Sequence, residues 1–225
     1  MPGQNLTRLE AAERSATVRT QSYDVVLDLT RGETVFGSTT TARFTATPGS
    51  STFIDLVAPT VRSITLNGTP LDPAEVYADS RIALKDLAAD NELVVVADCA
   101  YMHTGEGLHR FTDPADGETY LYSQFEVPDS RRVFAVFEQP DLKAPFAFTV
   151  SPARRDGAAT FVFAPTEPMS SYVTAIVAGP YVGATDEYVA EDGRTVPLGV
   201  YCRKSLVEHM DSEEILDLTK RGFAY

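Results

Sequence analysis

The sequence has few of the residues that bind metals or form disulfides: its 225 residues include two cysteines, three histidines and no tryptophan. Cys99 and Cys202 lie in apolar, strand-like sequence, with no cysteine or histidine beside them at metal-ligand spacing. This excludes a disulfide framework, leaves a single bridge open, and favours buried, reduced thiols. His103, His109 and His209 have no second histidine four residues on, so we expect no metal site made by this chain alone. We expect His103 and His109 to be exposed in a loop.

Long apolar runs and an excess of positive charge are also absent. No window approaches 18 consecutive apolar residues, and residues 1–16 are polar and charged, unlike a signal peptide. Lys and Arg number 19 against 32 Asp and Glu, which gives a net charge of −13 at pH 7. We therefore expect a cytoplasmic protein with neither nucleic acid nor a membrane as partner. Its acidic surface could attract peptide α-amines, but such surfaces also serve simply to keep proteins soluble.

Signatures of nucleophilic catalysis and nucleotide binding are missing as well. The sequence contains no G-x-S-x-G, and Gly105-Glu106-Gly107 is too short for a phosphate loop and lacks the Lys-Ser/Thr that would follow it. Serine hydrolases and nucleotide-binding proteins therefore have no motif here.

The sequence does contain the period-two pattern of half-buried strands. Apolar residues alternate with polar ones at Tyr23, Val25, Leu27 and Leu29, and again at Ala42, Phe44 and Ala46. Further strands are predicted over residues 51–56, 61–66, 81–84, 93–100, 146–150, 160–164, 172–177, 181–188 and 196–203. Asn67-Gly68, between two apolar segments, is typical of a tight hairpin. The pattern predicts an all-β fold, a layered antiparallel β-sandwich.

A short helix is expected near each end. Asn5 is expected to cap a helix that runs to Arg14. Its apolar stripe would comprise Leu6, Leu9, Ala12 and Ala16. Asp211 and Glu214 have the spacing of a capping box, so a second helix should begin near Asp211, and the chain would cut it off at Tyr225. Its apolar positions are Ile215, Leu218 and Phe223.

Two ordered landmarks carry a family resemblance. The first comprises GLHRF at 107–111, YLYSQFE at 120–126, DSRRVF at 129–134 and EQPDLKAPF at 138–146; the second is PTEPMSSY at 165–172, followed by an apolar strand that ends at Gly179. Together they resemble the N-terminal domain of the aminopeptidase N family of zinc peptidases, most closely its actinobacterial branch. The resemblance covers essentially the whole chain. It implies a saddle-like N-terminal β domain over residues 1–203 and the first helix of a truncated catalytic domain over residues 204–225.

The resemblance assigns roles to two residues. Glu126 matches the family carboxylate that binds the free α-ammonium of the substrate, and Gln124 matches the neighbouring amide that lines the first side-chain subsite. A carboxylate suits this task, because an ammonium ion desolvated in a cleft needs a charge-assisted acceptor. Without the resemblance, each residue would be interpreted as an exposed polar side chain at a strand end.

The surrounding residues have two interpretations each. Arg131 and Arg132 would orient Glu126 or pair with Asp129 and Glu138, or else form ordinary surface ion pairs. The aromatic residues of this region are expected in the core and the cleft wall rather than in a base-stacking platform; they are Tyr120, Tyr122, Phe125, Phe134, Phe137, Phe146 and Phe148.

The family's catalytic motifs do not occur up to Tyr225. These are the zinc-binding H-E-x-x-H with its further Glu ligand, a Tyr that stabilises the oxyanion, and a G-x-M-E-N loop that also contacts the α-amine. Two functions stay open: the N-terminal fragment of a zinc aminopeptidase that binds peptide substrates and needs its missing catalytic domain, or a free-standing β module that binds peptides or proteins without catalysis. In both cases we expect this chain alone to bind no stoichiometric zinc and to be inactive.

Overall fold

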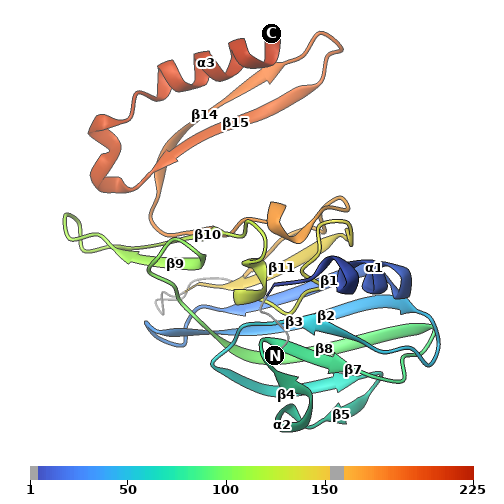
Figure 1. Cartoon of the computed structure of the whole chain (residues 1–225). Coiled ribbons are helices and arrows are strands. Elements are labelled where there is room, and N and C mark those ends of the chain that lie inside the picture. Colours follow the sequence, from blue (N-terminus) through green and yellow to red (C-terminus); the bar gives the residue numbers. More distant parts are fainter. Residues whose placement is uncertain (1–4, 153–159) are drawn as a thin grey trace. The chain divides into compact units, whose positions relative to one another are not determined.

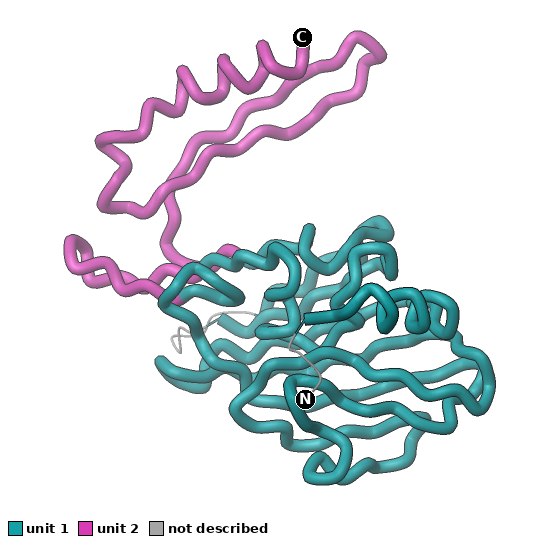
Figure 2. The backbone as a smooth tube through the Cα atoms, in the orientation of Figure 1, with its two compact units in different colours: residues 1–109, 122–176 teal, residues 110–121, 177–225 magenta. Residues whose placement is uncertain are grey.

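The computed structural model describes residues 5–152 and 160–225, which form two compact units (Figure 2). Unit 1 comprises residues 1–109 and 122–176, and unit 2 comprises residues 110–121 and 177–225. The boundary expected between residues 203 and 204 stays a prediction.

Unit 1 is built on a seven-stranded sheet (Figure 1). Its strand order is β12 (Phe161–Val162), β11 (Phe146–Ser151), β1 (Val18–Asp28), β2 (Val35–Ala46), β8 (Asp90–Ala100), β4 (Thr60–Leu66) and β5 (Thr69–Leu71). Neighbouring strands are antiparallel except β1 and β11, which run parallel. The predicted all-β, sandwich-like class with short terminal helices is confirmed.

Smaller sheets complete the fold. One contains β3 (Thr52–Asp55), β7 (Arg81–Leu84) and β6 (Tyr77–Ala78), and α2 (Pro73–Val76) precedes β6. Another contains β13 (Val177–Ala178), β10 (Thr119–Gln124) and β9 (Gly107–Thr112), and the division between the units falls within β9 and β10. In unit 2, β14 (Val182–Val189) and β15 (Thr195–Cys202) form a hairpin, followed by a 3-10 helix (Lys204–His209) and α3 (Ser212–Ala224).

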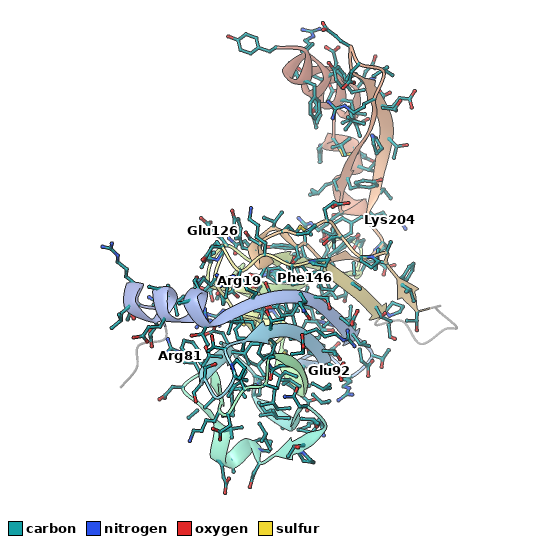
Figure 3. All side chains as sticks on the ribbon, turned by 90° about the vertical axis from the view of Figure 1, so that its right-hand side faces the viewer. Arg19, Arg81, Glu92, Glu126, Phe146 and Lys204 are labelled. Atoms are coloured by element: carbon teal, nitrogen blue, oxygen red, sulfur yellow. The ribbon has the colours of Figure 1, made fainter. Side chains whose placement is uncertain are left out.

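The core of unit 1 follows from the alternation of β1. Tyr23, Val25 and Leu27 are buried, and the Tyr23 ring stacks on Phe146 of β11 with centroids 4.8 Å apart. Figure 3 labels Phe146, which contributes to an aromatic cluster with Phe134. Of the aromatic residues expected in the core, five are buried: Tyr120, Phe125, Phe134, Phe137 and Phe146.

The hairpin predicted at Asn67-Gly68 is confirmed. Leu66 of β4 pairs with Thr69 of β5 across it. Asn67 and Gly68 have φ angles of 53° and 79°. A two-residue turn of this kind requires positive φ at both positions, which Asn and Gly adopt at low cost.

The N-terminal helix begins later than predicted. α1 spans Arg8–Thr17 and is capped by Thr7, not Asn5. Thr7 Oγ1 accepts the Glu10 N–H at 3.2 Å, and Glu10 Oε2 accepts the Thr7 N–H at 2.8 Å. The Asn5 prediction was wrong because this Thr-x-x-Glu box satisfies two backbone donors reciprocally, which a lone Asn does not.

The apolar stripe predicted for this helix was also wrong. Leu9 is 68% exposed, whereas Arg14 is the buried residue of α1, at 2% exposed. Arg14 Nη1 donates to Asp55 Oδ2 at 2.7 Å, and Arg14 Nε donates to Gln139 Oε1 at 3.0 Å. The guanidinium also lies 4.7 Å from the centroid of the Phe53 ring. The helix therefore docks through a charged side chain, which apolar periodicity cannot reveal.

Glu10 is expected to make stability depend on acidic pH. Its hydrogen bonds with Arg81 and with the Thr7 backbone lower the pKa of Glu10 from 4.5 to about 2. A lowered folded-state pKa stabilises the fold above the unfolded-state value, and this stabilisation is lost as the pH falls towards 2. In Glu10→Gln, the free energy of unfolding should therefore depend less on pH between 4.5 and about 2, as measured by urea denaturation at several pH values. Glu13→Gln, on the exposed face of α1, should not change this dependence. An identical pH dependence in both variants would contradict this role.

The C-terminal helix was predicted correctly, and one strand was not. Asp211 caps α3 by accepting the Glu214 N–H at 3.0 Å. The strand expected over residues 172–177 is instead a 3-10 helix (Ser171–Val173) that leads to the short β13. Two hydrogen bonds account for this: the Ser171 hydroxyl donates to Glu138, which is distant in the sequence, and the Thr174 N–H donates to the Ser171 carbonyl. These bonds turn the backbone before it can extend.

Within the described residues, no helix is both long and apolar enough to cross a membrane.

Candidate functional site

Gln124 and Glu126 lie together at the end of β10. Gln124 is the last residue of the strand, and its Oε1 accepts the backbone N–H of Glu126 at 3.2 Å. Both side chains are exposed, while Phe125 between them is 3% exposed. Because successive side chains of an extended segment point to opposite faces, burial of Phe125 directs both polar residues outward. Figure 3 shows Glu126 at the surface of unit 1.

The turn that follows Glu126 is closed by a backbone hydrogen bond. The Asp129 N–H donates to the Glu126 carbonyl at 3.2 Å, across a cis Val127–Pro128 bond. A 3-10 helix (Ser130–Arg132) follows at once. The ring of Phe125 meets Phe134 edge to face, with centroids 5.8 Å apart. Glu126 therefore has an exposed carboxylate on a backbone that is anchored on both sides.

The two arginines after this turn have different surroundings. Arg132 pairs with Asp129 at 2.7 Å and with Glu106 at 3.1 Å, which confirms the predicted contact with Asp129. Arg131 is buried, and its backbone N–H donates to Glu138 Oε2 at 2.7 Å. Arg132 thus braces the Asp129 end of the turn.

Glu138 is the centre of a buried polar cluster that sequence reasoning underestimated. It is 3% exposed and accepts hydrogen bonds from Ser130, Arg131 and Ser171. Burial raises the pKa of Glu138, and the hydrogen bonds from Ser130 and Ser171 oppose that shift. One signal was present in the sequence: Glu138 directly follows the apolar run Val133–Phe137, where a charged residue is expected to be buried with partners.

The two histidines predicted in a loop and the two cysteines differ in burial. The prediction that His109 lies in a loop was wrong: it lies in β9 and is half-buried. Its ring stacks on Tyr122 and accepts the Gly105 N–H at 3.0 Å. His103 is exposed as expected. Cys99 is fully buried, and burial raises the pKa of its thiol to about 12. Cys202 is half-buried and, like Cys99, forms no disulfide. Among the described residues, no group of three or more His, Cys, Asp or Glu could hold a metal ion.

Over 99% of its length, the chain is 53% identical to aminopeptidase N of Streptomyces lividans. The chain is thus a relative of aminopeptidase N. Its predicted likeness to the actinobacterial branch fits this match. The alignment covers 28% of the Streptomyces aminopeptidase N, so the chain spans little more than a quarter of that protein.

Two other matches are also aminopeptidases by name. Aminopeptidase 2, mitochondrial, of Saccharomyces cerevisiae is 29% identical over 52% of the chain and 13% of that protein. The crystal structure of Legionella pneumophila aminopeptidase A in complex with aspartic acid superposes with a TM-score of 0.73, over 87% of this chain and 25% of that one. At 17% identity, this second likeness shows the fold alone. No model of a protein family matches the sequence.

Proposed function

We propose that this chain is the substrate-anchoring N-terminal portion of a zinc-dependent aminopeptidase that releases N-terminal amino acids from peptides. The identity to aminopeptidase N over 99% of the chain supports the family of the parent enzyme. The observation that carries the anchoring role is the placement of Glu126, an exposed carboxylate on a firmly held turn beside Gln124. The zinc ligands and the general base would belong to a further, catalytic domain, so the chain alone would be inactive.

Glu126 would receive the free α-ammonium of the peptide. An ammonium group donates up to three hydrogen bonds, and its bond to a carboxylate is charge-assisted and strong. Gln124, beside it, would line the subsite for the first side chain. Neither an internal peptide bond nor an acetylated amino terminus offers an ammonium group, so binding there would leave Glu126 desolvated without a partner. This penalty would restrict cleavage to the amino terminus.

The coding sequence after Tyr225 and the substrate preference of its product test the proposal. We expect a G-x-M-E-N and H-E-x-x-H continuation, and a complete protein that cleaves leucine anilide but not its N-acetyl derivative. The 225-residue chain should cleave neither and hold no stoichiometric zinc, because it lacks the ligand motif. A stop codon after Tyr225, near one zinc per purified chain, or equal cleavage of the acetylated substrate would each contradict the proposal.

A further inference from the structure

We infer that Glu138 is a positioning residue that fixes the turn carrying Glu126, an inference that rests on the proposed function. The Glu138 carboxylate is almost fully buried and has partners on both oxygens. Its Oε2 accepts the Ser130 hydroxyl and the Arg131 backbone N–H, the latter at 2.7 Å. Its Oε1 accepts the Ser171 hydroxyl at 2.7 Å. Two of the three donors therefore come from the segment directly after Glu126.

These bonds reach Glu126 through a short length of backbone. Ser130 begins the 3-10 helix, and the residue before it, Asp129, donates its N–H to the Glu126 carbonyl. Before Glu126, the buried ring of Phe125 packs against Phe134 and anchors the backbone at the end of β10. The position of Glu126 is thus set by Phe125 before it and by the bonds of Ser130 and Arg131 to Glu138 after it.

Glu138 is itself held by elements outside this turn. Its backbone N–H donates to Asp55 Oδ2 of β3 at 3.1 Å, and its carbonyl accepts from Arg14 Nη2 of α1 at 3.3 Å. Asp55 also exchanges two backbone hydrogen bonds with Val136, at 2.9 and 3.0 Å. Glu138 therefore links the turn to β3 and α1 by hydrogen bonds. Supporting residues commonly hold a binding group in place in this way.

A carboxylate suits this place because three donors converge on it. A buried charge is costly unless its lone pairs are satisfied, and here both oxygens accept hydrogen bonds. Glu138→Ala would leave buried donors unpaired and could prevent folding. The sharper variant is Ser130→Ala, which removes one donor on the turn and leaves the carboxylate with two others.

Ser170→Ala is a matched control. Ser130 and Ser170 are both buried serines, at 0% and 5% exposed, and each hydroxyl donates one hydrogen bond. The Ser170 hydroxyl donates to the Pro140 carbonyl, not to Glu138. Each substitution removes one hydrogen bond from a buried serine and should lower Tm, more so in Ser130→Ala because its acceptor is a carboxylate, whereas only Ser130→Ala loosens the turn of Glu126.

The test is the kinetics of these variants in the complete enzyme. Because Glu126 is proposed to bind the α-ammonium, a displaced Glu126 binds the peptide less well, so Ser130→Ala should raise KM for leucine anilide on the order of tenfold, with kcat changed by less than about twofold. Ser170→Ala should change neither. In a Glu126→Ala background, Ser130→Ala should add nothing to KM, because the residue through which it acts is gone.

Two results overturn this inference alone. One is a KM in Ser130→Ala equal to that of Ser170→Ala while Glu126→Ala raises KM. The other is an equal rise in KM from Ser130→Ala with and without Glu126, which a general loss of structure would produce. An unchanged KM in Glu126→Ala instead overturns the proposed function, and the inference with it.

Discussion

Replacing Glu126 with alanine in the complete enzyme is expected to lower kcat/KM by about 2 to 4 kcal/mol, mainly through a higher KM. This corresponds to roughly 30- to 700-fold at about 1.4 kcal/mol per factor of ten. The physical reason is that a desolvated α-ammonium loses its charged acceptor. Because Glu126 is exposed in this structure, the substitution should leave Tm nearly unchanged. Steady-state kinetics on leucine anilide, with Tm measured in parallel, check both expectations.

Two variants show whether the charge of Glu126 causes this loss. Glu126→Gln keeps an oxygen acceptor without the charge, so its kcat/KM should fall between wild type and Glu126→Ala. Glu75→Ala removes an exposed glutamate from α2 and should leave kcat/KM unaltered. If Glu126→Ala behaves like Glu75→Ala, the anchoring role is wrong.

Features with a short-range physical signal could be predicted from the sequence. The alternation that includes Tyr23 and Leu27 predicts β1, and Asn67-Gly68 predicts its hairpin because the turn needs positive φ. The capping spacing of Asp211 predicts α3. Each signal lies within a few residues of the structure it determines. The resemblance in the 120–146 segment added Gln124 and Glu126, which the structure places side by side; their roles stay predictions.

Two of the missed features depend on partners distant in the sequence. From the sequence alone, an arginine such as Arg14 is expected to face solvent. It is buried because it bonds to Asp55 and Gln139, which are 41 and 125 residues away. The 172–177 segment has strand-like composition, yet the Ser171 hydroxyl reaches Glu138 and bends the chain. The strand propensity of this segment is overridden because the buried carboxylate of Glu138 needs hydrogen-bond donors.

Replacing Arg14 with alanine is expected to destabilise unit 1 by about 3 to 5 kcal/mol, since it leaves a buried carboxylate without its counter-charge. Arg14 and Asp55 are 2% and 3% exposed and lie 2.7 Å apart. Such a loss is a large share of the ~5 to 15 kcal/mol that stabilises a typical domain. Urea denaturation of the 225-residue chain, followed by circular dichroism, measures it.

Two further variants separate the charge of Arg14 from its packing and from ion pairs in general. Arg14→Met keeps much of the apolar stem but leaves Asp55 without its counter-charge, so its cost should approach that of Arg14→Ala. Arg43 pairs with Asp24 and Glu92 on the surface, where its side chain is 44% exposed, so Arg43→Ala should cost less than about 1 kcal/mol. Equal costs for Arg14→Ala and Arg43→Ala would mean that the buried pair does not fasten α1. A large cost for Arg14→Ala with a small one for Arg14→Met would mean that packing of the apolar stem, rather than charge, holds the helix.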